Sequence, residues 1–354
     1  MSIPQSSFED RYDAFIDSVL NFAQERARHL ATRTHYQFGP LGIELQVEGE
    51  HLAHRLTMAI RHARDVPWES AGDTVKVIAI DGEVAGNRPP AWNLPTSDRR
   101  HLERLHISAD GQRLLHHNPD TTNWTVFDRE KKLAVTWTAS ADRLPDWEDS
   151  FPLRTILHWM SAAHSCCLAH AAVVERDGNA VLLTGRGGSG KSTTTVAALY
   201  SGMRTCGDDF VMVDPVQRSA HTLYDTLKLD ETSLDWFGDL KPRVANPSRA
   251  ADQKARVHLT DVMPDRLLKA TPLRAVLQPV ITDDPRPSLH RVDPGVVLRA
   301  LAPTTLFLLR GEERILADKL GALVRGLPTW QLRLTRRPME SAAYLGEQLG
   351  AWPW

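Results

Sequence analysis

Apolar positions near the start of the chain recur at the spacing of an amphipathic helix. They fall three or four residues apart, at Phe15, Ile16, Val19, Leu20 and Ala23. That spacing places the side chains on one face of a helix. Ser7 precedes the run and Asp10 follows three residues later, which forms an imperfect capping box. The pattern predicts an N-terminal helix that packs against another element.

Further patterns over the first 150 residues predict a mixture of strands and one more helix. Ile43, Leu45 and Val47 alternate with polar neighbours as in a strand, and residues 50–64 show helical spacing. Strand-like segments follow at residues 75–80, 105–108, 112–116 and 124–137. Turn-forming residues at 87–90 and 118–120 separate them. Residues 1–150 therefore predict a small α+β domain that serves as a substrate or regulatory unit.

A helix and a β-hairpin are predicted next, at the start of a second domain over residues 151–354. Residues 151–168 have the helical pattern, and apolar runs at 170–176 and 179–184 flank the turn pair Asp177-Gly178. A two-residue turn pairs Arg176 with Asn179. Counting back along both strands places His170 opposite Gly185, so an imidazole is expected beside whatever Gly185 binds.

The segment after this hairpin has the G-x-x-x-x-G-K-[ST] pattern of a nucleotide phosphate loop. Its residues are Gly185, Arg186, Gly187, Gly188, Ser189, Gly190, Lys191 and Ser192, with Thr193 following. Glycines let backbone N–H groups turn toward phosphate oxygens, Lys191 places a charge at the β- and γ-phosphates, and Ser192 is suited to bind Mg²⁺. The preceding apolar strand and a helix at residues 192–200, closed by Gly202, supply the expected context.

Two adjacent carboxylates, Asp208 and Asp209, interrupt the apolar segment at residues 203–213. Buried carboxylates are costly without a partner. Neighbouring side chains of an extended strand point to opposite faces, so the two acids are expected to have different tasks. One would face the phosphates, directly or through Mg²⁺, and the other would be held by a partner such as His170. The alternative is a solvated strand end or turn.

The rest of the second domain carries weaker patterns. They predict a hairpin over residues 216–229, loops at 235–252, a buried apolar run at 298–309, a helix at 314–326 and a strand at 329–334. Phosphoryl transfer needs positive charge near the migrating group. The candidate cations are Lys228, Arg243, Arg249, Lys254 and Arg256. The pattern does not select one of them.

Composition excludes several classes of protein. A formal net charge of −2 over 354 residues argues against a binder of nucleic acid or membrane surfaces that works by bulk charge. The three cysteines form no disulfide framework, and there is no apolar run long enough for a membrane span. The start of the chain is polar and lacks a targeting pattern. We therefore expect a soluble, cytoplasmic protein.

Three histidines raise the question of a metal site, and four tryptophans raise the question of a peptide groove. His158, His164 and His170 are six residues apart and cannot share one helical face, so a metal site is not favoured. The tryptophans of the first domain would either line a peptide groove or pack in the core, and core packing is the favoured alternative. They are Trp68, Trp92, Trp124 and Trp137.

The ordered set of His170, the Asp177-Gly178 turn, the phosphate loop and Gly207-Asp208-Asp209 resembles the HPr kinase/phosphorylase family. It is most similar to HPr-kinase-related serine kinases, some of which modify ribosomally made peptides. The resemblance implies a P-loop kinase core with a mixed sheet, like that of phosphoenolpyruvate carboxykinase. It implies that Asp208 is the catalytic carboxylate and that Asp209 pairs with His170, with Lys191 as the fourth member of the catalytic set.

The resemblance also implies ATP and Mg²⁺ as cofactors, with Ser192 and Asp209 as the metal ligands. The expected reaction is transfer of the γ-phosphate to a serine hydroxyl of a peptide or protein, for example a precursor peptide. Lys228 stands where the bifunctional enzymes carry an acidic signature, which argues against HPr as the acceptor. The alternatives are a nucleotide-responsive regulator without transfer and a kinase of a small hydroxylated metabolite. A homo-oligomer is a further expectation from the family.

Overall fold

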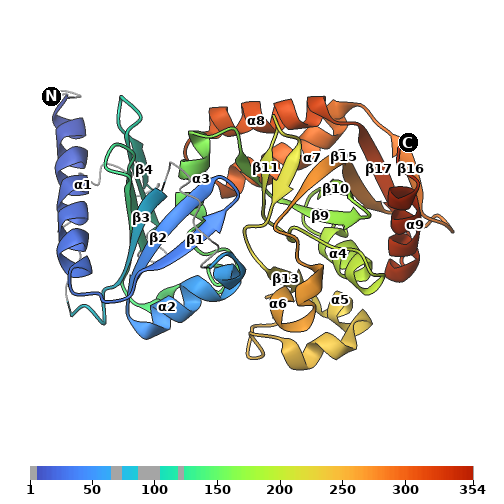
Figure 1. Ribbon diagram of the computed structural model, residues 1–354, viewed down its shortest axis with the longest axis horizontal. Coiled ribbons are helices and arrows are strands. Elements are labelled where there is room, and N and C mark those ends of the chain that lie inside the picture. The colour runs from blue at the N-terminus through green and yellow to red at the C-terminus, as the bar shows by residue number, and fades with distance from the viewer. Residues whose placement is uncertain (1–5, 65–73, 87–103, 119–122, 354) are drawn as a thin grey trace. The chain divides into compact units, whose positions relative to one another are not determined.

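The computed structural model describes residues 6–64, 74–86, 104–118 and 123–353. The chain divides into two compact units, Met1–Met160 and Ser161–Trp354. Each unit combines helices with a sheet that contains both parallel and antiparallel strands (Figure 1). The expected mixed α/β class is therefore confirmed. The functions predicted for residues 1–150 and 151–354 stay predictions.

The described part of the first unit contains a seven-stranded sheet of order β1-β2-β3-β7-β6-β5-β4. Strand β3 lies parallel to both β2 and β7, and the other neighbours are antiparallel. The strands are β1 Thr34–Phe38, β2 Leu41–Glu48, β3 Thr74–Asp81, β4 Arg104–Ile107, β5 Arg113–Asn118, β6 Asn123–Asp128 and β7 Leu133–Thr138. The segment predicted as one strand at residues 124–137 is thus a hairpin, β6–β7, because Arg129 to Lys132 form a turn.

The described residues up to Ala162 also form three α-helices and two 3₁₀ segments. The helices are α1 Ser6–Ala27, α2 Glu50–Thr57 and α3 Arg154–Ala162, with 3₁₀ turns at Met58–Ala63 and Ala141–Arg143. The two helices predicted before residue 65 are confirmed, although the second one tightens to 3₁₀ geometry in its last part. The predicted turns at 87–90 and 119–120 lie outside the described residues.

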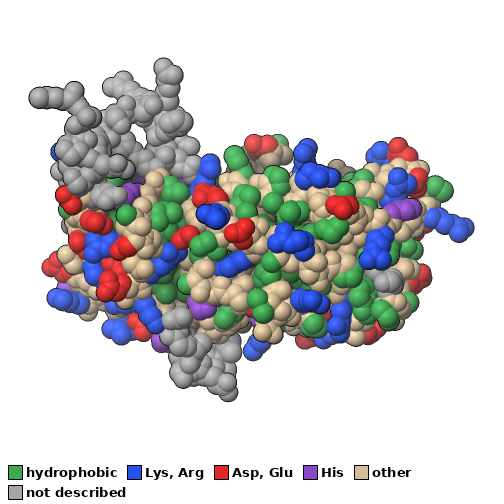
Figure 2. All heavy atoms as spheres, turned by 90° about the horizontal axis from the view of Figure 1, so that it is seen from above, with side chains coloured by type: hydrophobic (Ala, Val, Ile, Leu, Met, Phe, Trp, Pro, Cys, Tyr) green, Lys and Arg blue, Asp and Glu red, His purple; other side chains and the backbone are tan. Residues whose placement is uncertain are grey.

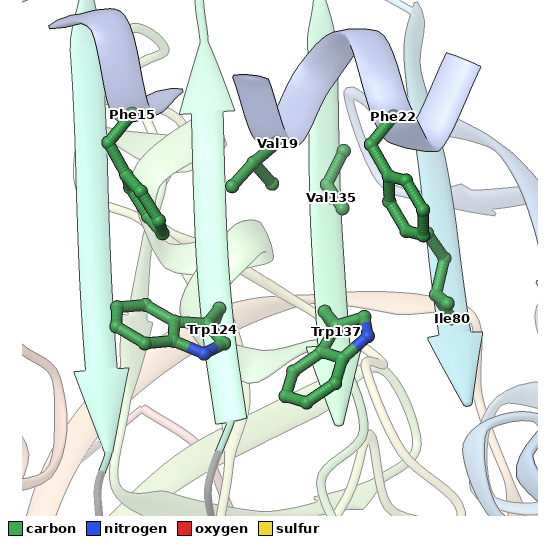
Figure 3. A pocket seen from close by; sticks show the side chains of 7 residues that line it. All are labelled: Phe15, Val19, Phe22, Ile80, Trp124, Val135 and Trp137. Carbon is green, nitrogen blue, oxygen red and sulfur yellow. The ribbon is translucent and has the colours of Figure 1, made fainter. Parts of the chain in front are cut away.

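Helix α1 packs its apolar face directly on the sheet. Phe15, Val19 and Phe22 point from the helix toward Trp124 and Trp137 on the strands below (Figure 3). The cavity among these side chains measures about 10 Å³, which is the space of one water molecule. Trp124 and Trp137 are 6% and 4% exposed. They belong to the core, whereas Trp68 and Trp92 lie outside the described residues.

The helix predicted over residues 151–168 is wrong at its C-terminal end. Helix α3 stops at Ala162, and strand β8 follows at Cys167–Ala169. The ammonium of Lys319 donates to the carbonyl oxygens of Ser161 and Cys166, among others in this bend, at 2.8 and 3.0 Å. This distant lysine satisfies carbonyls that a continuing helix would have paired. The local pattern contains no trace of it.

The sheet of the second unit runs β16-β17-β15-β12-β11-β8, with β10 beside β15 and β9 beside β10. Strands β10, β15 and β17 are parallel to one another, and the remaining pairs are antiparallel. The bounds are β8 Cys167–Ala169, β9 Ala171–Arg176, β10 Asn179–Thr184, β11 Val211–Asp214, β12 Ser219–His221, β15 Ala270–Ile281, β16 Ser288–Arg291 and β17 Thr329–Leu334. A separate ribbon pairs β13 Thr226–Leu229 with β14 Ala255–His258.

Helices cover both faces of this second sheet (Figure 1). One side carries α7 Pro294–Leu308 and α8 Glu313–Gly326, and the other carries α4 Lys191–Tyr200 and α9 Pro338–Gly350. Apolar residues of α4, α9, β9 and β10 form a continuous core with the inner face of the β13–β14 ribbon. Shorter helical segments are α5 Glu231–Trp236, α6 Leu259–Val262 and the 3₁₀ turns Gly238–Arg243 and Pro264–Arg266.

Two strand predictions in this unit are wrong. The apolar segment at residues 203–213 is extended only over Val211–Asp214, because Asp209 adopts a left-handed backbone with φ of 77°. The predicted hairpin at residues 216–229 does not form. Strand β12 pairs with β11 and β15, and β13 pairs with the distant β14. The long strand β15 and helix α9 had no counterpart among the predictions.

Acidic and basic side chains intermingle on the face of the molecule shown in Figure 2, in line with the small net charge of −2. Over the described residues, every helix is too short or too polar to cross a bilayer.

Candidate functional site

The predicted phosphate loop connects the end of β10 to the start of α4. Residues 185–190 form a bend between the buried strand and Lys191, the first helical residue. The N–H groups of a helix start have no partners within the helix and attract anions. Gly188 and Gly190 take φ values of 78° and 94°, which other residues rarely adopt. The sequence pattern therefore folds into the expected strand, loop and helix.

Lys191 lies inside the loop, where its charge is available to an anion. Its side chain is buried and donates to the carbonyl oxygens of Gly185 at 2.6 Å and Arg186 at 3.4 Å. Burial lowers the pKa of Lys191, and the charges of Asp209 and Asp208 partly oppose this shift. A phosphate on the loop would compensate the charge that burial disfavours. The lysine is thus held at the position its predicted role requires.

The hydroxyl residues of the loop have different environments. Within the part of the chain that the structure describes, the buried Ser189 hydroxyl has no hydrogen-bond partner. Ser192 favours the ionised form of Asp208 through its side chain. Thr193 shares a hydrogen bond of 2.8 Å with Ser233 of α5. Thr193 therefore links α5 to the first turn of α4, next to the loop. Arg186, Gly187 and Gly188 are exposed at the tip.

Asp208 is fully buried beside the loop. Among the described residues, the Ser192 side chain is near enough to act on it as a hydrogen-bond donor, although neither carboxylate oxygen has a partner at full hydrogen-bond geometry. Burial is the main reason that its pKa rises to about 6, and the neighbouring Asp209 adds to the rise. Ser192, Lys254 and Lys191 act in the opposite direction. A buried carboxylate without a partner is costly and is typical of functional sites. Asp208 is thus suited to accept a proton or bind a cation.

Asp209 has a contrasting environment, with both oxygens engaged. His170 Nε2 lies 2.5 Å from Oδ1, and Lys228 Nζ lies 3.3 Å from Oδ2. Burial alone would raise the pKa of Asp209, but the hydrogen bond to His170 and the charge of Lys228 lower it overall. Asp209 is therefore ionised and positioned. The predicted contact between His170 and one of the two acids is present.

The position of His170 follows from two strand pairings that meet at this residue. Thr184 pairs with Ala171 across β10 and β9, as the two-residue turn predicts. Ala169 pairs with Val211 across β8 and β11. His170 lies between β8 and β9, so one pairing brings it beside the phosphate loop and the other beside the Asp208-Asp209 pair. Its backbone N–H is fixed by the Thr305 hydroxyl at 3.0 Å.

The candidate cations are separated by the structure into near and distant groups. Lys228 lies opposite Arg256 in the β13–β14 ribbon, and the alternating residues Leu227 and Val257 face the core. The opposite face of the ribbon therefore carries the charged residues. The exposed Lys254 is close enough for its charge to lower the pKa of Asp208 and of Asp209.

Arg249 and Arg243 have other surroundings. Arg249 forms an ion pair with Glu231, and Arg243 is exposed at the end of a 3₁₀ turn. Lys228 and Lys254 are the candidate cations whose charges lower the pKa of the two adjacent aspartate carboxyl groups.

A buried acid and imidazole on the same ribbon were missed by the sequence analysis. Asp225 Oδ1 lies 2.9 Å from His258 Nδ1, and the Thr260 hydroxyl donates to the second oxygen of Asp225. Both residues of the pair are nearly inaccessible. The alternating sequence Ala255-Arg256-Val257-His258 was the available signal for a strand here. Its partner β13 lies too far away in sequence for the pattern to identify.

The residues present fit a nucleotide with a magnesium ion. The unpartnered oxygens of Asp208 and the nearby Ser192 provide oxygen ligands. Asp209, the predicted metal ligand, could bind the ion only in competition with Lys228. No group of three or more acidic, histidine or cysteine side chains forms a metal cluster among the described residues. Mg²⁺ needs only one or two carboxylates when phosphates and water complete its shell.

Comparison with known proteins finds similarity among solved structures. No protein family model matches the chain. No curated protein matches it either. A solved structure of the Hpr(Ser) kinase/phosphatase from Coxiella burnetii is similar over 52% of this chain and 93% of that chain, with 12% identity and a TM-score of 0.29. Similarity of this extent does not establish membership of the family.

Proposed function

We propose that the chain is an ATP-dependent phosphotransferase that transfers the γ-phosphate to a hydroxyl group. The acceptor in this proposal is a serine of a peptide or protein, such as a precursor peptide. The observation that carries the proposal is Asp208, a fully buried carboxylate beside the phosphate loop whose pKa is raised by burial to about 6. Such a carboxylate is suited to accept the proton of an attacking hydroxyl.

Each surrounding residue has a place in this reaction. The hydroxyl oxygen of the acceptor forms a bond to the γ-phosphorus while the bond from that phosphorus to the β–γ bridging oxygen breaks and ADP leaves. Asp208 accepts the proton of the attacking hydroxyl. Lys191 places its charge on the phosphates, and Lys254 adds charge where the migrating group passes. His170 and Lys228 hold Asp209 ionised next to Asp208. The Ser192 hydroxyl would help to hold a Mg²⁺ ion, which would supply charge neutralisation on the phosphate oxygens.

The Asp208→Asn variant tests the proposal. General-base assistance contributes about 10²–10⁴-fold to a rate, so transfer should fall by at least about 100-fold while nucleotide affinity stays within about three-fold. The measurement is incubation with γ-labelled ATP and host peptides and proteins, followed by mass spectrometry for phosphoserine. Asp128→Asn, which alters a buried aspartate of the first unit, is the matched control and should retain full transfer.

Two results would contradict the proposal. Asp208→Asn that keeps more than about a tenth of wild-type turnover would remove the general base from the mechanism. Labelled ATP that is bound, or slowly hydrolysed, without labelling any acceptor would favour a nucleotide-responsive regulator. Lys191→Ala should abolish both binding and transfer, and it supplies the blank for acceptor identification.

A further inference from the structure

A cavity of about 210 Å³ lies directly beside the phosphate loop. Gly190 and Thr193 form its wall on the loop side, and Trp236, Ile281 and Leu334 supply most of its apolar lining. Trp236 and Ile281 are 49% and 47% exposed, which is unusual for large apolar side chains. The proposed transfer chemistry uses neither residue.

The cavity lies where the sheet topology favours ligand binding. Strands β10, β15 and β17 run parallel, and the loop, Ile281 and Leu334 mark their carboxyl ends. Open sheets with parallel strands bind their ligands at this edge. A Cβ atom added to Gly190 would approach Leu334 Cδ1 to 2.8 Å. The phosphate loop and the cavity wall are therefore in direct contact.

The position of Trp236 is tied to the loop through two hydrogen bonds. Thr193 Oγ1 lies 2.8 Å from Ser233 Oγ, and the backbone N–H of Ser233 donates to Asp230 at 2.8 Å. Asp230 caps α5, the short helix that ends at Trp236. The indole is thus held on an element that is fastened to the first turn of α4, beside the loop.

We propose that this cavity binds the base of the nucleotide, with Trp236 as its stacking surface. The inference rests on the proposed nucleotide site, because the phosphates fix one end of the ligand on the loop. A volume of about 210 Å³ is smaller than the ~300–1,000 Å³ that encloses a whole drug-sized ligand. It suits one ring system of a ligand whose charged part lies elsewhere. Thr335 and Arg336 at the rim supply polar groups for the base edge.

Calorimetric titration with two ligands separates the base from the phosphates. ATP carries a base, and inorganic tripolyphosphate does not, so both are titrated in the presence of Mg²⁺ into the full chain. Base stacking on an aromatic side chain corresponds to about a ten-fold change in affinity or more. Trp236→Ala should weaken ATP by at least about ten-fold and tripolyphosphate by less than about two-fold. Trp236→Phe should restore most of the ATP affinity.

Two control variants and a second cavity variant accompany this comparison. Trp147→Ala alters another partly exposed tryptophan, 38% exposed and in the first unit, and should leave both affinities unchanged. Lys191→Ala should weaken both ligands together, because it acts on the phosphates. Ile281→Ala, on another wall of the cavity, should weaken ATP selectively as Trp236→Ala does.

The outcomes distinguish this inference from the proposed function. Selective loss of ATP affinity supports the base site even if no acceptor is ever phosphorylated. Equal loss of both ligands in Trp236→Ala, or no loss of either, overturns the base site and leaves the transfer reaction open to its own test. A wild-type chain that binds tripolyphosphate as tightly as ATP also overturns it.

Discussion

Asp208 and Asp209 are adjacent in sequence but have opposite environments. Asp208 is fully buried, and its pKa is raised to about 6 by burial first and by Asp209 second. Asp209 is held by His170 and Lys228, which lower its pKa despite burial. Neighbouring acids with separated pKa values commonly divide the tasks of proton transfer and electrostatic support. This division supports Asp208 as the base.

The pH dependence of transfer follows from the raised pKa of Asp208. A general base acts only when ionised, so kcat/KM should fall as pH drops through about 6. Lys254 favours the ionised form, so Lys254→Met should move this acidic limb to higher pH. The measurement is a pH profile of kcat/KM for wild type and variant. If the acidic limb of the profile does not move in Lys254→Met, the ionisation of Asp208 is not its cause.

The loop between β10 and α4 is the element on which the site depends. Gly188 and Gly190 both adopt left-handed backbone angles. They differ in surroundings: a Cβ atom on Gly188 meets no atom within 4 Å, whereas one on Gly190 meets Leu334 Cδ1 at 2.8 Å. A side chain at Gly188 therefore brings only the cost of the left-handed backbone, whereas one at Gly190 adds the cost of the close contact with Leu334.

Alanine at each glycine tests this difference. Gly188→Ala should lower the free energy of unfolding by about 1–2 kcal/mol, the cost of a left-handed backbone. Gly190→Ala should cost more and also weaken ATP, because Leu334 must move. Leu334→Ala should recover part of that additional loss in the double variant. Urea unfolding of the single and double variants measures both terms. Equal costs at the two glycines would show that the contact with Leu334 has no energetic effect.

At the scale of the whole molecule, the two units carry separate hydrophobic cores. Phe15, Leu20 and Val126 belong to the core of the first unit, and Val196 and Leu345 to that of the second. The phosphate loop and both carboxylates lie in the second unit. A ligand of the site therefore stabilises that unit directly.

Calorimetry should resolve this organisation as more than one thermal transition. Leu345→Ala and Val126→Ala, each a loss of buried volume that costs about 1–5 kcal/mol, should lower different transitions and so assign them. MgATP at about 100 times its Kd should stabilise the transition of the second unit by about 2.7 kcal/mol. The transition lowered by Val126→Ala should not respond to MgATP. A uniform shift of all transitions would contradict independent cores.

Local patterns predicted several elements closely. The strand at Thr329–Leu334, the helix at Glu313–Gly326 and the register of the β9–β10 hairpin follow from residues within each segment. The predictions failed where a residue far away in the sequence determines the end of an element or the pairing of a strand. Lys319 contacts the carbonyls beyond the end of α3, and β13 pairs with β14 across a long insertion. A local window contains neither partner.

The sequence by itself determined the phosphate loop, the hairpin that places His170 beside it, and the presence of two acids after the next helix. These features depend on turn chemistry and short-range spacing, which neighbouring residues fix. Only the tertiary structure decided which lysines approach the acids and that Trp236 lines a cavity beside Gly190. Those contacts join residues far apart in the chain, and burial, which sets the pKa of Asp208, exists only after the chain has folded.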